Sequence, residues 1–246
     1  MSRNPELFQQ IDREDESFPA PVPPAISGNG HRHRFDIDAF RREEEMKLVQ
    51  RLFILPGPDA PRMVVFCGVE SGDASSWVCT RAGETLASQV KTSVCVVNAN
   101  LRTPSLHEHF QIDNSCGLTD AVLKPGPIRN FAHQLNGGNL WVITSGSRTT
   151  DPHTLLTSDR LQSRMTEIRA EFDYVLLDGP PVNLYVDATL LGKMAEGVVL
   201  VLQANSTRRE TARKARESLE SAKVRLWGAV LNKRTFPVPD LLYRNI

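Results

Sequence analysis

One stretch of this chain, residues 62–87, has the layout of a phosphate-binding strand, loop and helix. Residues 63–67 form a short apolar run that predicts a buried strand. Residues 68–75 are mainly small or polar, and the sequence from Ser76 onward favours a helix. A nucleotide-binding loop requires its elements in this order. The stretch therefore limits the fold to one in which a buried strand runs into such a loop.

The loop lacks the residues that bind phosphate in the pattern G-x-x-x-x-G-K-[ST]. In that pattern, backbone N–H groups and a helix N-terminus cradle the phosphates, the Lys reaches their outer oxygens and the hydroxyl holds Mg²⁺. When Ser76 is placed on the hydroxyl position, Ser75 stands where the Lys belongs and Ala74 where the preceding Gly belongs. The layout is kept and the positive charge is missing.

Length and composition favour a single soluble α/β domain. The chain has 246 residues, of which 40% are hydrophobic, enough for one substantial core. Lys plus Arg and Asp plus Glu both number 29, so the basic excess of a nucleic-acid-binding protein is missing. No apolar run approaches the roughly 20 residues of a membrane span, and no signal peptide is evident. We expect a cytoplasmic protein that reaches the inner face of the membrane only through a partner.

The N-terminal part predicts a tail followed by a helix. Residues 1–35 are polar and proline-bearing, which predicts a disordered tail, with a polyproline ligand as the alternative. Over residues 36–55, apolar side chains recur at helical spacing and predict a leading amphipathic helix with Glu43, Glu44 and Glu45 facing solvent. We expect one domain over residues 36–246.

Beyond the loop, apolar runs alternate with helical patterns. Such alternation implies right-handed crossovers, a mainly parallel sheet, a three-layer α/β/α architecture and a site at the carboxyl ends of the strands. Asn98, Asn100, Asp178 and Asn232 fall at such ends. In chain order, we expect a helix over 76–90, a strand over 94–97, a short helix over 117–123, a strand over 139–144, a helix over 151–168, strands over 172–177 and 197–202, a helix over 207–222 and a strand over 225–231.

A series of ordered motifs follows the loop VFCGVESGDASS: VCVVNANLRTPSLHEHF, GLTDAVL, DPHTLLTSDRL, FDYVLLDGPP, DATLLGKMAEGVVLVLQANSTRRETARKA and GAVLN. Together they resemble the cytoplasmic domain of bacterial tyrosine kinases, P-loop proteins that control capsule and exopolysaccharide chain length and are related to the Min and Par ATPases. The resemblance covers residues 43–232. It implies a P-loop NTPase-like fold, ATP with Mg²⁺ as cofactors, and a transmembrane polysaccharide co-polymerase, or chain-length determinant protein, as partner.

The resemblance also assigns the loop residues. The family loop reads approximately T-S-x-x-P-G-E-G-K-[ST]-T. Gly72, the acidic Asp73 and the hydroxyl of Ser76 match this pattern. Ala74, Ser75 and Trp77 depart from it. As cofactor-binding positions the resemblance gives Gly72, Asp73, Ala74, Ser75, Ser76, Trp77 and, near the purine, Asn232.

A second family motif has lost its carboxylates here. The family pattern D-x-D-x-R-x-P, which serves Mg²⁺ and proton transfer, reads with Asn98 and Asn100 in place of the two Asp residues. An amide is no base near pH 7 and is a poorer Mg²⁺ ligand than a carboxylate. The third motif is intact at Asp178, which the resemblance makes catalytic and, together with Ser76, a ligand of Mg²⁺ if that ion binds.

These losses predict a non-catalytic, pseudokinase-like regulator or scaffold of the exopolysaccharide system. The alternative is an active ATP-dependent tyrosine autokinase or ATPase that uses Asp178 and Ser76 with a cation from elsewhere, for which Arg102 is the nearest candidate. Nucleotide binding without turnover is an intermediate case. A partitioning ATPase is the weakest interpretation, because it also needs the Lys. The sequence leaves open whether the protein is an enzyme and which cofactor, if any, it keeps.

Two further features bear on assembly and on phosphorylation. The family helix before the loop carries a Glu, Arg, Arg repeat that joins subunits into rings, and Glu44, Lys47 and Gln50 occupy its positions. This is a weakened repeat, so homo-oligomer formation stays open. The C-terminal tail offers only Tyr243, where family kinases carry a tyrosine cluster. A surface or packing role for Tyr243 is the simpler interpretation.

Overall fold

The computed structural model describes residues 37–135 and 137–233. The tail expected over residues 1–35 and the single tail tyrosine, Tyr243, lie outside these ranges. The expectations for both segments therefore stay predictions.

The chain divides into two units, residues 1–41 and 42–246. All the strands that the structure describes belong to the second unit. The single domain over residues 36–246 stays a prediction, since the division falls inside its leading helix.

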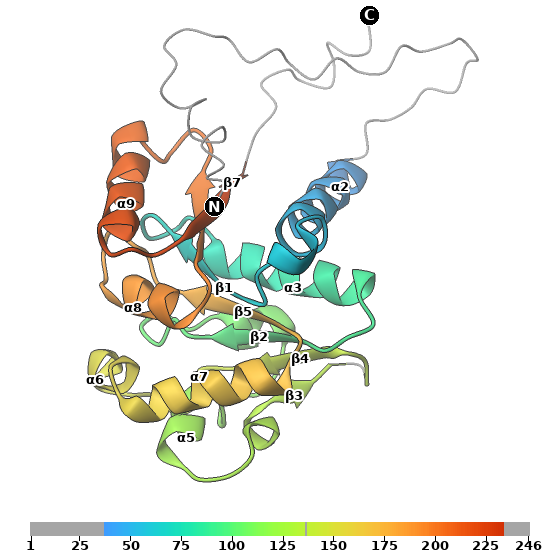
Figure 1. The fold of residues 1–246 in the computed structure, drawn as a ribbon, viewed down its shortest axis with the longest axis vertical. Helices are drawn as coiled ribbons and strands as arrows, with labels where there is room; N and C mark the ends of the chain where they lie inside the picture. The colour runs from blue at the N-terminus through green and yellow to red at the C-terminus, as the bar shows by residue number, and fades with distance from the viewer. Residues whose placement is uncertain (1–36, 136, 234–246) are drawn as a thin grey trace, which may run out of the picture. The chain divides into compact units, whose positions relative to one another are not determined.

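The described strands form one seven-stranded sheet in the order β3-β4-β2-β5-β1-β6-β7 (Figure 1). Every neighbouring pair is parallel except β3 with β4, which confirms the mainly parallel sheet. The sequence missed β3, because two residues give no periodicity to detect. The bounds are β1 (Met63–Gly68), β2 (Val94–Asn98), β3 (His133–Gln134), β4 (Leu140–Ile143), β5 (Tyr174–Gly179), β6 (Val198–Gln203) and β7 (Leu226–Asn232).

Helices cover both faces of this sheet, as the three-layer prediction requires (Figure 1). One face packs against η1, α3 and α4, and the other against η3 and α5 to α9. The bounds are α2 (Ile37–Val49), the π-helix η1 (Gln50–Ile54), the 3₁₀-helix η2 (Gly57–Asp59), α3 (Ser75–Gln89), α4 (Leu106–Phe110), α5 (Leu118–Leu123), the 3₁₀-helix η3 (Ile128–Phe131), α6 (Pro152–Leu156), α7 (Asp159–Glu171), α8 (Asp187–Met194) and α9 (Arg209–Ser221).

The alternation of side chains along the strands decides which polar groups meet. Val96 in β2 and Leu176 in β5 are buried in the same cluster as Phe66, on the α3 side of the sheet. Two positions further along these strands, Asn98 and Asp178 point to that same side. The register of the sheet pairs Asn98 with Asp178. The fold therefore brings one amide and one carboxyl together beside α3.

The helix expected over residues 151–168 is two helices. Asp151 caps α6 as its sequence predicts, with Oδ1 accepting the N–H of Thr154 at 3.1 Å. The chain then leaves the helical path, and Ser158 caps α7 by accepting the N–H of Leu161 on its hydroxyl at 3.2 Å. A serine at this place satisfies the first N–H groups of a new helix, which favours a second start over continuation.

The expectation that Glu43, Glu44 and Glu45 all face solvent was wrong for Glu45. Its side chain is only 11% exposed, and its two oxygens accept from Arg81 Nε at 3.1 Å and Nη2 at 2.8 Å. Arg81 lies in α3 and also pairs with Glu84. This two-pronged ion pair joins the end of α2 to α3. The partner stands 36 positions away, so helical spacing alone does not reveal it.

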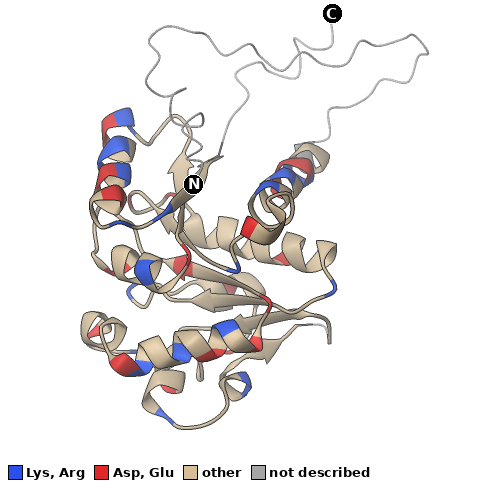
Figure 2. Ribbon diagram, in the orientation of Figure 1, with Lys and Arg blue, Asp and Glu red and all other residues tan. Residues whose placement is uncertain are grey.

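Charge is mixed over the described helices. Figure 2 shows basic and acidic residues interspersed along α7 and α9, so neither helix presents a stripe of one sign. None of the helices that the structure describes combines the length and apolar character needed to cross a bilayer.

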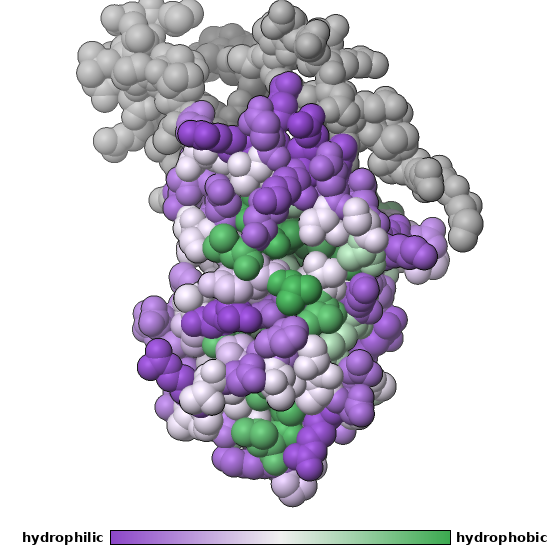
Figure 3. All heavy atoms as spheres, turned by 90° about the vertical axis from the view of Figure 1, so that its left-hand side faces the viewer, coloured by the Kyte–Doolittle hydropathy of each residue, from purple (hydrophilic) through white to green (hydrophobic). Residues whose placement is uncertain are grey.

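Exposed apolar side chains form separate patches on the face that carries α6, α8 and α9 (Figure 3). Among the described residues, Leu184 and Val186, just before α8, are 50% and 57% exposed, and Leu123 at the end of α5 is 58% exposed. Single apolar residues of this kind are ordinary on protein surfaces. They indicate no particular partner.

Asp120 holds the start of α5 against the segment after β4. Its Oδ2 accepts the backbone N–H of Gly117 at 3.1 Å and that of Ser147 at 2.9 Å. Its Oδ1 accepts from the Ser147 hydroxyl at 2.8 Å and from Lys124 Nζ at 2.9 Å. Burial alone would raise the pKa of Asp120, but the hydrogen bonds from Ser147, Lys124 and Gly117 lower it to about 2.

Replacing Asp120 by Asn should lower the free energy of unfolding by about 2 kcal/mol near pH 7, because an amide cannot accept from all four donors. The lowered pKa means that the carboxylate stabilises the fold above about pH 4 and that this contribution is lost as the pH falls toward 2. Urea unfolding at pH 7 and pH 3 should show the gap to the wild type shrinking at pH 3, and the exposed Asp59→Asn should show no gap. A gap independent of pH would contradict the assignment.

Candidate functional site

The loop between β1 and α3 keeps the backbone form of a phosphate loop. Ala74, the residue before α3, has φ 58° and ψ 38°, and Gly72 has φ 92°. A left-handed alanine costs about 1–2 kcal/mol, so the loop retains a glycine-type conformation without the glycine. No side chain caps the N-terminus of α3. Its first N–H groups, from Ser75 onward, are therefore available to an anion.

Asp73 shapes the loop from inside. Its Oδ2 accepts the N–H groups of Val69 at 2.7 Å and Glu70 at 2.8 Å, and its Oδ1 lies 3.4 Å from the Thr207 hydroxyl. The residue is 5% exposed. Its charge is thus engaged by the loop itself and by the turn before α9, which makes Asp73 a structural residue of the loop.

The end of β7 clasps the loop from outside. Asn232 Nδ2 donates to the Asp73 carbonyl at 3.4 Å, and Asn232 Oδ1 accepts the N–H of Lys233 at 2.8 Å. Lys233 Nζ donates to the Gly72 carbonyl at 3.1 Å and to Gln203 Oε1 at 3.4 Å. The resemblance gave Asn232 a purine contact, whereas here both ends of its amide have partners within the chain.

Lys233 is the residue that sequence reasoning missed. It follows Asn232 directly, so its place at a strand end was readable from the sequence. Its contact with the loop was not, because 161 positions separate Lys233 from Gly72.

Asp178 and Asn98 are both fully buried beside the first turn of α3. No side-chain atom of either has a hydrogen-bond partner among the described residues. Burial raises the pKa of Asp178 to about 7, and the nearby Ser76 hydroxyl opposes that rise without forming a well-shaped hydrogen bond. Ser76 and Asp178 are therefore brought together, as the sequence predicts. Buried polar groups without partners are uncommon in packed cores, so this cluster is the candidate site.

The side chains of Asn100 and Arg102 form their hydrogen bonds with residues outside this cluster. Asn100 Nδ2 donates to the Thr103 hydroxyl at 3.0 Å, and Asn100 Oδ1 accepts the N–H of Thr103 at 3.3 Å. Arg102 Nε donates to Asp187 Oδ2 at 2.6 Å, and its guanidinium lies 4.2 Å from the ring centroid of Tyr185. Arg102 is thus committed to an ion pair with a buried carboxylate. It does not replace the missing loop lysine.

The remaining loop positions differ in burial. Trp77 is partly buried and packs against the apolar cluster on the α3 side of the sheet. The Trp77 ring therefore contributes to packing, and only the backbone of Trp77 could contact a ligand in the loop. Ser75 is half-buried and neutral.

The donor set for Mg²⁺ is smaller than the resemblance implies, although Ser76 and Asp178, which would hold the ion in a P-loop protein, are both present. A protein-bound Mg²⁺ prefers carboxylates and phosphate oxygens. Here the cluster offers one carboxyl, Asp178, whose charge burial suppresses near neutral pH, together with the Ser76 hydroxyl and the amide of Asn98. Within the described residues, no three His, Cys, Asp or Glu side chains are grouped to hold a metal.

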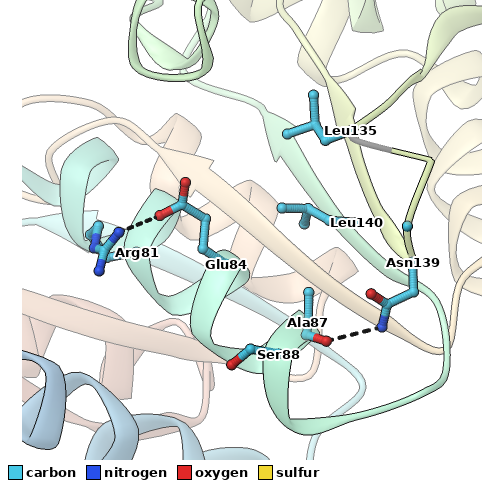
Figure 4. A pocket seen from close by; sticks show the side chains of 8 residues that line it. Arg81, Glu84, Ala87, Ser88, Leu135, Asn139 and Leu140 are labelled. Carbon is cyan, nitrogen blue, oxygen red and sulfur yellow. Dashed lines mark hydrogen bonds and ion pairs between the residues drawn. The ribbon is translucent and has the colours of Figure 1, made fainter.

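A hollow of about 430 Å³ opens elsewhere, between the second half of α3 and the β3–β4 hairpin (Figure 4). Its polar groups are already paired: Arg81 binds Glu84, and Asn139 Nδ2 donates to the Ala87 carbonyl at 3.2 Å. It lies at the far end of α3 from the loop and shares no residue with the site. The lining residues are Arg81, Glu84, Ala87, Ser88, Leu135, Gly138, Asn139 and Leu140.

Comparison with known proteins supports the fold and a family. The chain is 35% identical over 161 residues to the tyrosine-protein kinase YwqD of Bacillus subtilis. The aligned residues cover 65% of this chain and 68% of YwqD. Its structure is similar to the kinase domain of the Escherichia coli tyrosine kinase ETK, with a TM-score of 0.73, 22% identity, and 80% and 78% of the two chains covered. No family model matches the chain.

The fold also extends to a more distant group. The MinC:MinD cell division protein complex of Aquifex aeolicus contains a chain with a TM-score of 0.60, 17% identity, and coverage of 74% of this chain and 72% of that one. The P-loop NTPase-like fold predicted from the sequence is confirmed. At such identities the likeness concerns the fold alone.

Replacing Ala74 by Gly should raise the free energy of unfolding by about 0.5–1 kcal/mol, because glycine adopts the left-handed conformation without strain. Urea unfolding measures the change. The matched control is Ala87→Gly within α3, which should lower stability by about 1 kcal/mol, since glycine is a poor helix residue. Destabilisation by both changes would show that Ala74 is unstrained.

Replacing Asp178 by Asn should stabilise the protein at high pH. Since the folded pKa is raised to about 7 from about 3.9 in the unfolded chain, the native state binds the extra proton, and stability falls as the pH rises from 4 to 7. We expect a gain of at most about 4 kcal/mol for the variant at pH 8 and little change at pH 4.5. Urea unfolding in metal-free buffer at both pH values measures it. An equal effect at both would rule out a buried titrating carboxyl.

Proposed function

Since this chain belongs to the family of bacterial tyrosine kinases, we propose that it has kept the family's fold, has lost phosphoryl transfer, and acts as a regulator or scaffold in capsule or exopolysaccharide synthesis. One observation carries the proposal. The cluster where a transferred phosphate would lie consists of Ser75, Ser76, Asn98 and Asp178, and this cluster contains no cation and a single carboxyl.

The chemistry of phosphoryl transfer makes this deficit large. Catalysis depends on positive charge at the transferring group, and a single cationic residue there supplies about 10³–10⁵ in rate. Ser75 supplies none, and the amides of Asn98 and Asn100 neither take a proton from a tyrosine hydroxyl nor hold Mg²⁺ well. The residues at these three positions therefore weaken neutralisation of the phosphate charge, proton transfer and Mg²⁺ binding together.

The alternative is an active autokinase or ATPase that relies on Asp178 and Ser76. It requires a cation from outside the loop. Arg102 was the sequence's candidate, and Lys233, whose Nζ donates to the Gly72 carbonyl, is a second one that the structure brings to the loop. The bond from Arg102 to Asp187 and its stacking on Tyr185 argue against that role. The loss of the carboxylates at Asn98 and Asn100 favours the non-catalytic function whichever cation lies near the loop.

The proposed partner is a transmembrane polysaccharide co-polymerase, which would hold the protein at the inner face of the membrane. Family resemblance motivates this partner. Homo-oligomer formation through α2 has weaker support, because Lys47 Nζ lies 2.9 Å from both Glu43 and Glu44 of its own helix. Lys47, the cation that would contact a neighbouring subunit, already forms ion pairs within its own helix.

The test is phosphate transfer from labelled ATP with Mg²⁺, to the protein itself and to a tyrosine-containing peptide. We expect no incorporation above the protein-free background. YwqD of Bacillus subtilis, purified in the same way, serves as the positive control. A second sample combines Ser75→Lys, Asn98→Asp and Asn100→Asp, which puts back the missing charges.

The contradicting result is phosphotyrosine formed by the unmodified chain and abolished by Asp178→Asn. That outcome would establish the active alternative. Incorporation that survives Asp178→Asn would point to a contaminating kinase.

A further inference from the structure

β7 is the last strand of the sheet and has a neighbour on one side only. Its partner among the described strands is β6 (Figure 1). The Asn232 carbonyl of β7 accepts the N–H of Ala204, the residue after β6. Because successive residues of a strand point their N–H and C=O groups to opposite sides, Ala229 and Leu231 point theirs away from β6. Within the described ranges, no backbone hydrogen bond is formed on that side.

This edge has little of the protection that sheet edges usually carry. The strand reads LWGAVLN and contains neither a charged residue nor a proline, which are the usual means of preventing further pairing. Its pairing with β6 is shifted between Val198 and Val199 and is regular from Gly228 to Asn232. Leu231 is 56% exposed. The regular part of β7 is therefore suited to accept an extended segment as a further strand.

The edge also has room for the side chains of such a segment. A Cβ added at Gly228 would meet no atom within 4 Å. Val230, two residues further along, packs against the apolar cluster on the α3 side, so the space at Gly228 opens on that same side. The ring of Trp227 borders the same cluster. An apolar side chain from an added strand fits this space.

Both ends of β7 are basic. Lys223 and Arg225 precede the strand, Lys233 follows it, and all three are exposed. The Arg225 guanidinium lies 3.5 Å from the ring centroid of Trp227, and Lys233 Nζ donates to two neutral oxygens. In the part of the chain that the structure describes, no carboxylate oxygen lies within 4 Å of these three cations. The charges favour a partner segment with carboxylates at its two ends.

The same charges oppose a second copy of this chain. Antiparallel pairing of two β7 strands centred on Ala229 would set Arg225 of one copy against Lys233 of the other. Like charges placed opposite each other across a strand pair are destabilising.

We propose that the open edge of β7 binds an extended segment of a partner protein, apolar in its middle and acidic at both ends, as an additional strand. The outward backbone groups of Ala229 and Leu231 supply hydrogen bonds, and the basic ends select the partner. This binding is independent of the proposed function, because it uses the edge of the sheet and holds whether or not the chain transfers phosphate.

The experiment is titration calorimetry of the full chain with a synthetic peptide, EEVTVTVEE, blocked at both ends. We expect a Kd below about 1 mM, and weaker binding when the salt is raised from about 20 to about 200 mM. Two control peptides test the mode of binding. One carries Lys in place of every Glu, and the other is N-methylated at alternate residues, which removes the N–H groups of one edge. Each should bind at least about tenfold more weakly.

Two variants at Leu231 place the peptide on β7. The N–H of Leu231 points away from β6, so Leu231→Pro leaves the β6–β7 pairing intact and blocks an added strand. It should lower the affinity for EEVTVTVEE about tenfold or more. The matched control, Leu231→Val, keeps the N–H and should preserve the affinity within about twofold. Circular dichroism checks the folding of both variants, and the N-methylated peptide decides the mode of binding if Leu231→Pro is unfolded.

A charge reversal tests the basic ends. Arg225→Glu should weaken binding of EEVTVTVEE and strengthen binding of the Lys-containing peptide. Lys91→Glu reverses an exposed charge in the segment after α3 and should change neither affinity by more than about twofold.

The proposal is overturned by any of three results: no binding of EEVTVTVEE, equal binding of its N-methylated form, or full affinity in a folded Leu231→Pro variant. Light scattering of the chain alone supplies a fourth. A dimer that Leu231→Pro dissociates, together with no binding of the peptide, would assign the edge to a second copy. The phosphate-transfer assay leaves all of these outcomes unchanged, so the two proposals stand or fall separately.

Discussion

The parallel pairing of β5 with both β1 and β2 is the constraint on which the site depends. It sets Asp178 opposite Phe66 on one side and opposite Asn98 on the other. Because side chains alternate along a strand, this register turns Asn98 and Asp178 toward the start of α3 together. A shift of one residue in either strand would bury an apolar side chain there instead. The loop would then have no polar side chains beneath it, even if its backbone kept the same form.

Much of this arrangement follows from the sequence because its signals are local. Short apolar runs mark the buried parallel strands, and polar residues at their ends mark the functional edge. The Asp151 cap is also a local signal. The break between α6 and α7 depends on whether Ser158 caps or continues a helix, and either choice is locally acceptable. Tertiary packing decides it, so a single long helix was predicted.

The clasp on the loop could not be predicted for a different reason. Thr207, Asn232 and Lys233 reach Asp73 and Gly72 across 134 to 161 positions of chain. Nothing in the spacing of a single sequence carries such a contact. The left-handed conformation of Ala74, by contrast, agrees with the local pattern, because Ala74 stands where the phosphate-loop pattern has a Gly, the residue that adopts this conformation without strain.

The substitutions in the site are electrostatically consistent with one another. Compared with the family pattern, the cluster at the loop has lost one positive charge at Ser75 and one negative charge at Asn98, and a second carboxylate is missing at Asn100, whose amide bonds to Thr103. Losing the lysine alone would leave carboxylates facing phosphate oxygens with no cation between them. Losing the carboxylate at position 98 as well removes that repulsion and leaves the N–H donor of Asn98 in its place. The loop therefore remains compatible with an anion even though it no longer has the charges that move a phosphoryl group.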